Sequence, residues 1–212
     1  MFNFQSTADA ALVGDLTEII NMLNHGHEWH EKTTSCAGFN GHLHVLKFAH
    51  EHNFIFHPLT LVECAHHGHL QCIQFLHEVV KFSWNSLCFD FASKYGYAQI
   101  LQYAYEHGCT FEVVVFDTAA RYGHYDCLRV LFNTTSIHDI KSNTSITQNA
   151  WQGGHDECLR YAISRGCSIH PCALPRWNDI QATIQAVYQI VVTCLEHTLV
   201  NDILLFVLQP YL

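Results

Sequence analysis

Small and apolar residues recur along this chain at fixed distances from six glycines. The glycines are Gly14, Gly41, Gly68, Gly96, Gly123 and Gly154, so successive spacings are 27, 27, 28, 27 and 31 residues. The fourth residue before each glycine is small: Ala10, Ala37, Cys64, Ala92, Ala119 and Ala150. The fifth residue after it is Ile19, Leu46, Ile73, Leu101, Leu128 or Leu159, and the eighth is Met22, Ala49, Leu76, Ala104, Leu131 or Ala162. Because residues three or four positions apart share one face of an α-helix, each repeat predicts a helix with a buried side.

Each repeat is therefore expected to consist of two helices joined by a tight turn at the glycine, where a left-handed backbone ends the first helix. Gly26, Gly108 and Gly166 are expected to end the second helix in the same way. A pair of short helices buries its apolar face only by stacking on similar neighbours, which predicts a solenoid. A helical bundle is the alternative, but a bundle does not require six repeats with matching turn glycines.

The connection to the next repeat is expected to end on a large apolar residue, fifteen positions after the glycine. This residue is Trp29, Phe56, Phe111 or Ile169 in four repeats. In the repeat whose spacing is 28 residues, Trp84 comes one place later. This offset predicts a single inserted residue in that loop.

Several segments resemble short ankyrin-like repeats, a variant common in large DNA viruses of amoebae and in some protists. The resemblance covers residues 7–170 and rests on strings such as GHLHVLKFAHEHNFIF and GYAQILQYAYEHGCTF. An ankyrin repeat has about 33 residues and a Thr-Pro-Leu-His opening, whereas the period here is shorter and that opening is absent. The resemblance implies an all-α solenoid of about six ankyrin-like helix-turn-helix repeats with short loops in place of long hairpins.

The pattern changes near both ends of the repeat array. Residues 1–170 are expected to form the array, with the first repeat as its N-terminal cap, and residues 171–212 a divergent helical C-terminal cap of the same structural domain. Pro175 is expected to interrupt the chain before helices at 178–197 and 201–208. The alternative role of these apolar helices is self-association or partner binding. The polar segment after Leu131 predicts an irregular loop in the fifth repeat.

Charge and composition exclude several classes of protein. The 212 residues contain 10 Lys and Arg against 19 Asp and Glu, a formal net charge of −9, so nucleic-acid binding is not expected. The N-terminus lacks the features of a secretory signal, and the longest apolar run, 203–208, is too short to insert into a membrane. An intracellular location, in the cytoplasm or nucleus of a host cell, is therefore expected, with a virus particle as the alternative. There the 10 cysteines should remain thiols.

Eighteen histidines raise the question of metal binding. The segment Cys64, His66, His67, His69 and Cys72 has a zinc-like composition but no standard zinc spacing, and both cysteines fall in core positions of the repeat. A loop cluster, His25, His27 and His30, lacks acidic or thiol partners at a regular spacing. We therefore expect no metal and no cofactor. No catalytic motif is found either, so an enzyme is not expected.

The remaining expectation is recognition of a protein partner through variable positions of the first helices. The sixth residue before the glycine is Ser35, Val62, Asp90, Asp117 or Gln148, and the second is Phe39, His66, Lys94, Arg121 or Gln152. These residues are expected to line one surface, although simple solvation of polar side chains explains each of them equally well. The predicted function is a non-enzymatic interaction module: an adaptor, scaffold or host-factor binder. The alternative is a structural component of a virus particle or other assembly, which self-associates through its repeats and C-terminal helices.

Overall fold

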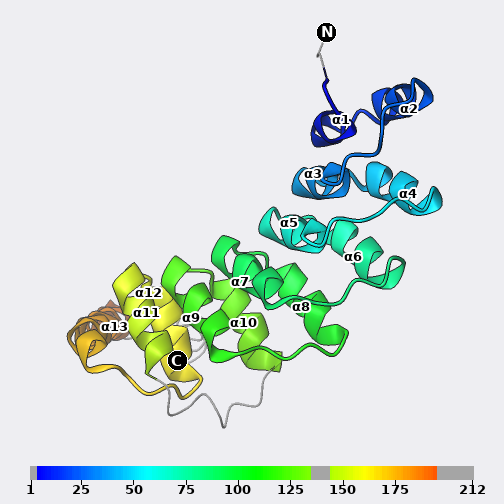
Figure 1. Ribbon diagram of the computed structural model, residues 1–212. Coiled ribbons are helices and arrows are strands. Elements are labelled where there is room, and N and C mark those ends of the chain that lie inside the picture. Colours follow the sequence, from blue (N-terminus) through cyan, green and yellow to red (C-terminus); the bar gives the residue numbers. More distant parts are fainter. Residues whose placement is uncertain (1–3, 135–143, 195–212) are drawn as a thin grey trace. The chain divides into compact units, whose positions relative to one another are not determined.

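The protein folds as a series of short helices joined by tight turns (Figure 1). The computed structural model describes residues 4–134 and 144–194, with side chains up to residue 189. Within these ranges the regular structure is helical, without strands. The paired helices are α1 (Thr7–Val13) with α2 (Leu16–Asn24), α3 (Thr33–Phe39) with α4 (Leu43–Glu51), α5 (Thr60–His66) with α6 (Leu70–Glu78), α7 (Ser86–Tyr95) with α8 (Ala98–Glu106), α9 (Val113–Tyr122) with α10 (Tyr125–Thr134), and α11 (Ser145–Gly153) with α12 (Asp156–Ser164). A short 3-10 helix, η2 (Pro171–Ala173), precedes α13 (Leu174–Cys194).

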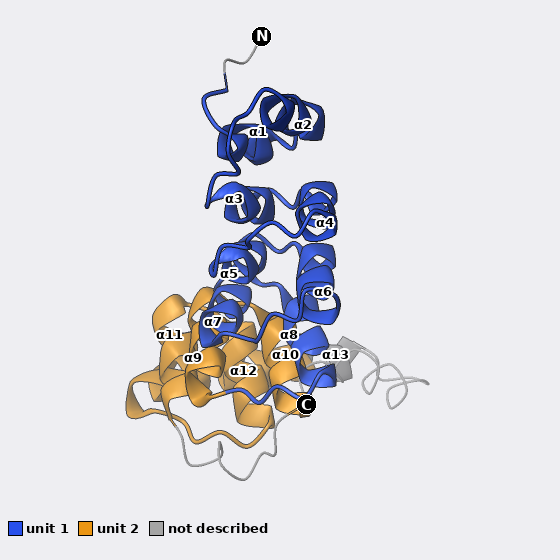
Figure 2. Ribbon diagram, turned by 45° about the vertical axis from the view of Figure 1, so that its right-hand side comes forward, with its two compact units in different colours: residues 1–111 blue, residues 112–212 orange. Residues whose placement is uncertain are grey.

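The chain forms two units, residues 1–111 and 112–212. In unit 1 the first helices of successive repeats, α1, α3, α5 and α7, pack on one another in series, and each also packs against the second helix of its own repeat. Figure 2 shows these first helices in one column and α2, α4, α6 and α8 in a second column. In unit 2, α9 packs on α11 and α10 on α12. The predicted all-helical architecture with serial packing is confirmed.

The core of each unit consists of the predicted small and apolar positions. All six small residues four positions before the glycines are fully buried, as are all six aliphatic residues five positions after them. Small residues in the first helix let neighbouring first helices approach closely. At Gly38 in α3 the helices are too close for a larger side chain, because an added Cβ would lie 2.9 Å from the backbone oxygen of Thr60 in α5. The positions that the helical period identifies in the sequence are therefore the ones that pack in the core.

The turn glycines adopt the left-handed conformation that the sequence predicts. Gly41, for example, has φ +72°. A larger side chain is unfavourable at Gly14 and Gly41 because a ring from the next repeat packs on each of them. The ring of His69, from the next repeat, packs on Gly41, and its Nε2–H donates to the carbonyl of Phe39 at 3.0 Å. The ring of His42 covers Gly14 in the same way and donates to the carbonyl of Leu12.

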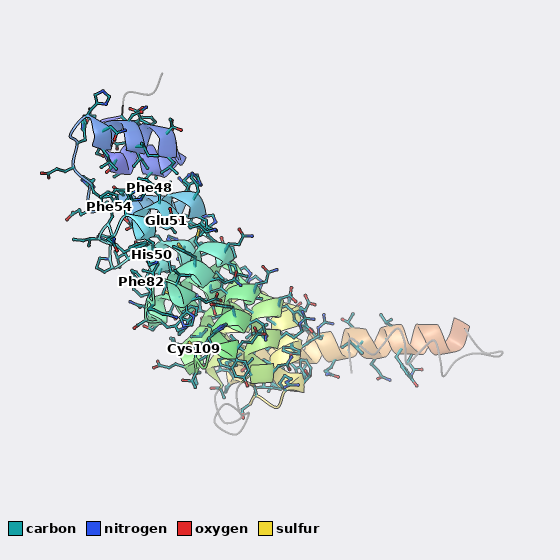
Figure 3. All side chains as sticks on the ribbon, turned by 90° about the vertical axis from the view of Figure 1, so that its right-hand side faces the viewer. Phe48, His50, Glu51, Phe54, Phe82 and Cys109 are labelled. Carbon is teal, nitrogen blue, oxygen red and sulfur yellow. The ribbon has the colours of Figure 1, made fainter. Side chains whose placement is uncertain are left out.

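The loops between repeats begin at equivalent positions, and one of them contains the predicted insertion. In regular repeats the amide thirteen residues after the glycine donates to the carbonyl eight residues after it, as from Phe54 and Cys109. In the third repeat Phe82 makes this bond one place later, after Lys81 with φ +66°. Figure 3 shows Phe54, Phe82 and Cys109 along one edge of unit 1. Trp84 is thus the equivalent of Phe56, as the spacing predicted.

A hydrogen-bonded brace at the start of the first helix was missed from the sequence. The His57 amide donates to the hydroxyl of Thr34 in the preceding repeat, at 2.8 Å. The His57 carbonyl accepts from the hydroxyl of Thr60, and Nδ1 of the His57 ring accepts from the amide of Leu59. His30 makes the same three kinds of bond one repeat earlier. Four of these six bonds thus satisfy buried threonine hydroxyls, and the two from the histidine amides tie successive repeats together.

The C-terminal region differs from its prediction at Pro175. This residue lies in the first turn of α13 rather than interrupting the chain, because proline is favoured where a helix has no amide partner to lose. The helix consequently begins at Leu174, four residues before the predicted start. Arg176 anchors it by a two-pronged ion pair with Asp156 of α12, at 2.8 Å for both bonds. The predicted helix at 201–208 and most of the predicted irregular loop lie outside the described residues.

Candidate functional site

A continuous row of aromatic and imidazole rings crosses the first helices of three repeats in unit 1. We call Phe39, His66, His67, Phe91 and Tyr95 the ring row. The Phe39 and His67 ring centroids are 3.9 Å apart, and those of His66 and His67 are 4.4 Å apart. His66 stacks on Phe91 at 4.4 Å with an interplanar angle of 18° and lies 5.0 Å from Tyr95. The row therefore links α3, α5 and α7 through direct ring contacts.

The rings of the row lie outside the core. In each first helix the fourth residue before the glycine faces inward, so the second residue before it, Phe39 or His66, falls on the opposite side of the last turn. Phe39 and Tyr95 are the most accessible members, at 40% and 41% of their full exposure. His66 and His67 are half-buried between them. The row is a surface feature with large apolar area still open to solvent.

The eight residues predicted to bind a partner are divided between the two units. The structure brings Phe39 and His66 together in the ring row, where His67 lies between their rings. Lys94 lies beside the row, with its Nζ 5.3 Å from the centre of the Tyr95 ring. Phe39, Arg121 and Gln152 are exposed, whereas His66, Asp90, Lys94, Asp117 and Gln148 are half-buried.

Positions six before the glycine are less accessible than predicted. Val62, which the pattern placed on the variable surface, is only 6% exposed. The adjacent first helix covers this flank, as Asp117 demonstrates in unit 2. Its carboxylate accepts from the Ser145 hydroxyl of α11 at 2.6 Å, and burial raises the pKa of Asp117. Asp117 therefore contributes to the packing of α9 against α11.

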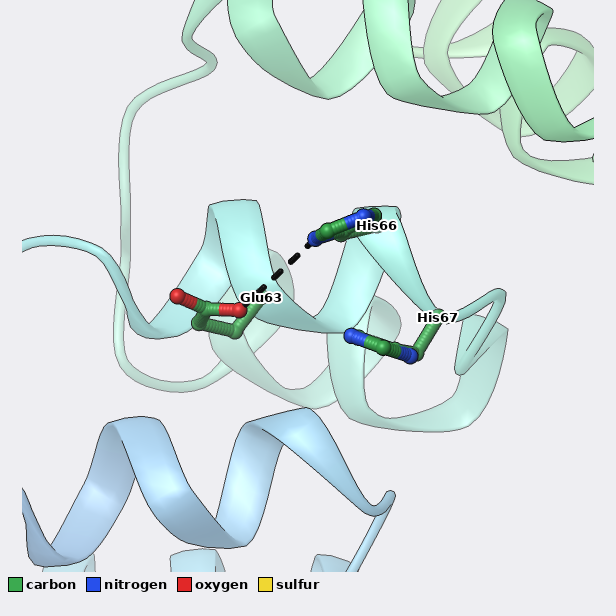
Figure 4. Close-up of side chains that lie close together, drawn as sticks. All are labelled: Glu63, His66 and His67. Carbon is green, nitrogen blue, oxygen red and sulfur yellow. Dashed lines mark ion pairs between the residues drawn. The ribbon is translucent and has the colours of Figure 1, made fainter.

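Glu63, His66 and His67 converge at the C-terminal end of α5 (Figure 4). One potential ligand atom from each side chain lies within 4.8 Å of the others. Among the described residues, these three side chains form the group that is close enough together to hold a metal ion. Glu63 Oε2 lies 4.0 Å from His66 Nδ1. Burial, followed by the neighbouring His66, lowers the pKa of His67. The sequence pattern did not single out Glu63, although it precedes the two histidines by three and four residues, a spacing that places them on one face of a helix.

Many other histidines have structural roles in turns. His42 and His69 cover turn glycines, and His30 and His57 form the braces described above. In unit 2, Nδ1 of His170 accepts from the Cys172 amide at 3.2 Å. These contacts give five of the eighteen histidines a structural role that needs no ligand.

Buried thiols such as Cys88 and Cys127 are poorly suited to nucleophilic chemistry. The nine cysteines whose side chains are described form no disulfide with one another. Burial raises the pKa of Cys88 to about 11 and that of Cys127 to about 12. Both thiols are therefore protonated near neutral pH. Since the thiolate is the reactive form, they are poor nucleophiles.

Comparisons with known proteins assign no family to the chain. No family model matches it, and no curated protein is significantly similar to it. Among the described helices, none combines the length and hydrophobicity needed to cross a bilayer. Function must therefore be inferred from the surface that the repeats present.

Proposed function

We propose that the protein is a non-enzymatic interaction module that binds another protein through the ring row. The observation that carries this proposal is the continuity of partly exposed rings over three successive repeats. Aromatic side chains supply much of the binding energy at the centres of protein interfaces, because they bury large areas with few rotatable bonds. Here neighbouring rings already hold one another in place, so binding would cost little additional side-chain entropy.

Charge favours a protein over a nucleic acid as the partner. The net charge of −9 opposes association with a phosphate backbone. The ring row has Lys94 at one end and Glu63 close to its centre, a mixture suited to a polar rim around an apolar contact. The raised pKa values of Cys88 and Cys127 support a role without covalent catalysis at these thiols.

We also propose that the repeats are ankyrin-like and that the protein acts inside a cell, as a viral or cellular adaptor. Supporting the first point, the segment His57-Pro58-Leu59-Thr60 has the residue types of the ankyrin opening with histidine and threonine exchanged. In this order the threonine hydroxyl donates to the histidine carbonyl at 2.7 Å. A local hydrogen bond of this kind thus closes the turns that open α3 and α5.

Affinity capture with matched surface variants tests the proposed function. The full chain and a Phe39→Ala/Tyr95→Ala variant are expressed in the native cell, and co-purifying proteins are quantified by mass spectrometry. The control is Tyr105→Ala, which removes an equally exposed ring (43%) from the second helix α8. We expect at least one protein to be depleted about tenfold or more by the double substitution and unaffected by the control. Equal recovery with all three chains would contradict a role for the ring row.

Self-assembly is the second candidate function, and the exposure of α13 favours it. Leu174, Val187 and Tyr188 remain 47%, 43% and 39% exposed on this helix. A homo-oligomer formed through the C-terminal helices would cover such side chains. Sedimentation velocity on the full chain at several concentrations distinguishes the two functions. A monomer at all concentrations rules out self-assembly, whereas a dimer that Val187→Glu dissociates supports it.

A further inference from the structure

We propose that the C-terminal end of α5 binds a divalent transition-metal ion, with Glu63, His66 and His67 as its three protein ligands. The three residues occupy positions i, i+3 and i+4 of one helical turn, so the carboxylate lies above both rings on the same face. Figure 4 shows the carboxylate and the two rings turned toward a shared space. This site goes beyond the proposed protein binding and does not depend on it.

The separations suit a bridging ion better than direct contacts. Oε2 of Glu63 and Nδ1 of His66 are 4.0 Å apart, which is longer than a hydrogen bond. In a tetrahedral zinc site with bonds of about 2.1 Å, two ligand atoms lie roughly 3.4 Å apart. All three candidate atoms already lie within 4.8 Å of one another. Small side-chain rotations therefore close the site without any movement of the helix.

A hydrogen bond with Tyr95 of α7 fits the form of His66 that the site requires. Nε2 of His66 lies 3.1 Å from the hydroxyl of Tyr95. When this nitrogen carries the proton and donates it to Tyr95, Nδ1 presents its lone pair toward Glu63. Metal-binding histidines typically use their second nitrogen in this way, which fixes both the tautomer and the ring orientation. Tyr95 is thus a positioning residue for the proposed site.

His67 supplies the second, independent observation. Its Nε2 is buried and has no hydrogen-bond partner among the described residues. A buried polar atom without a partner is unfavourable, and such atoms in folded proteins call for an explanation. Coordination of a cation by this nitrogen would satisfy it. The rest of the ring is already held between Phe39 and His66.

Two histidines, one carboxylate and an open position match zinc, which accepts this donor set with water as the fourth ligand. The site differs from the zinc-like segment of the sequence. Cys64 is excluded as a ligand because its thiol is buried and hydrogen-bonded to Cys72, and His69 is used at Gly41. The proposal therefore revises the expectation of a metal-free protein. It retains only two of the five residues in that segment.

Zinc titration of the tag-free full chain, after removal of metal by a chelator, tests the proposal. Isothermal titration calorimetry should show one Zn²⁺ per chain. Glu63→Gln, His66→Gln and His67→Gln should each weaken binding at least tenfold. Tyr95→Phe keeps the ring but removes the hydroxyl, and it should weaken binding about tenfold. The matched control is His27→Gln, an exposed histidine of the loop cluster, which should leave the affinity unchanged.

Cobalt provides a readout of geometry that a loss of folding cannot imitate. Co²⁺ bound at the site should give visible absorption bands that appear with one equivalent and disappear on addition of Zn²⁺. Far-ultraviolet circular dichroism in chelator should show that all variants keep the helical content of the parent chain. Absence of stoichiometric Zn²⁺ binding would overturn the proposal. Unchanged affinity in His67→Gln, or an equal loss in His27→Gln, would overturn it as well.

Discussion

The contact between Gly41 and His69 gives the sharpest test of how successive repeats are joined. In Gly41→Ala the added methyl group would lie 2.5 Å from Nδ1 of His69, so the ring must move. The left-handed backbone at φ +72° adds a second penalty, because alanine is disfavoured there. Both effects occur at the boundary between the second and third repeats.

The expected magnitude follows from these two terms. Placing a non-glycine residue in the left-handed region costs about 1–2 kcal/mol. Moving the His69 ring breaks its 3.0 Å bond to the Phe39 carbonyl, for a further loss of about 0.5–1.5 kcal/mol. We therefore expect Gly41→Ala to reduce the free energy of unfolding by about 1.5–3.5 kcal/mol, measured by urea denaturation and circular dichroism.

Gly26 provides a matched control within the same unit. It also ends a helix with a left-handed backbone, at φ +87°, but an added Cβ would meet nothing within 4 Å. Gly26→Ala should therefore cost only the backbone term, about 1–2 kcal/mol. In a His69→Ala background, Gly41→Ala should fall to the same cost. Equal losses from Gly41→Ala and Gly26→Ala in the parent chain would refute the inter-repeat contact.

Three further predictions concern the core, pH and thiol reactivity. Leu101→Ala, at a fully buried position of α8, should lower the free energy of unfolding by about 2–5 kcal/mol, and a loss below about 1 kcal/mol would mean that the position is not in the core. Burial, together with His107, lowers the pKa of His77. As the pH falls, His77 is therefore protonated in the unfolded chain at a higher pH than in the folded chain, so the free energy of unfolding should decrease below about pH 6.5. His77→Gln should make this decrease smaller, as urea denaturation at several pH values would show. Iodoacetamide should modify exposed Cys172 in the native protein but Cys127 only after unfolding, as peptide mass spectrometry would show; equal rates would contradict the burial of Cys127.

Much of the fold was predictable because the same buried positions recur in every repeat of the sequence. Each core position recurs six times, so the columns around the glycines identify the buried helix faces without any tertiary information. The left-handed turns at residues such as Gly14 and Gly96 followed from the same alignment. The inserted residue near Lys81 was predictable because one spacing exceeded its neighbours by one.

Features that depend on contacts between repeats were harder to predict. The brace between His57 and Thr34 joins residues 23 positions apart, and neither residue type is distinctive in isolation. The burial of Val62 depends on the neighbouring first helix, which a single-repeat pattern does not describe. At the candidate metal site, cysteine content drew attention to Cys64, whereas the carboxylate of Glu63 had the informative helical spacing.

Site-specific photocrosslinking in the native cell tests the central claim most directly. A photoreactive benzoylphenylalanine replaces Phe39 or Tyr95 in the ring row, or Tyr105 on α8, one position at a time. The proposal predicts that the same partner protein is crosslinked from both ring-row positions and not from Tyr105. Crosslinks only from Tyr105, or only between copies of the chain itself, would contradict recognition of a partner through the ring row.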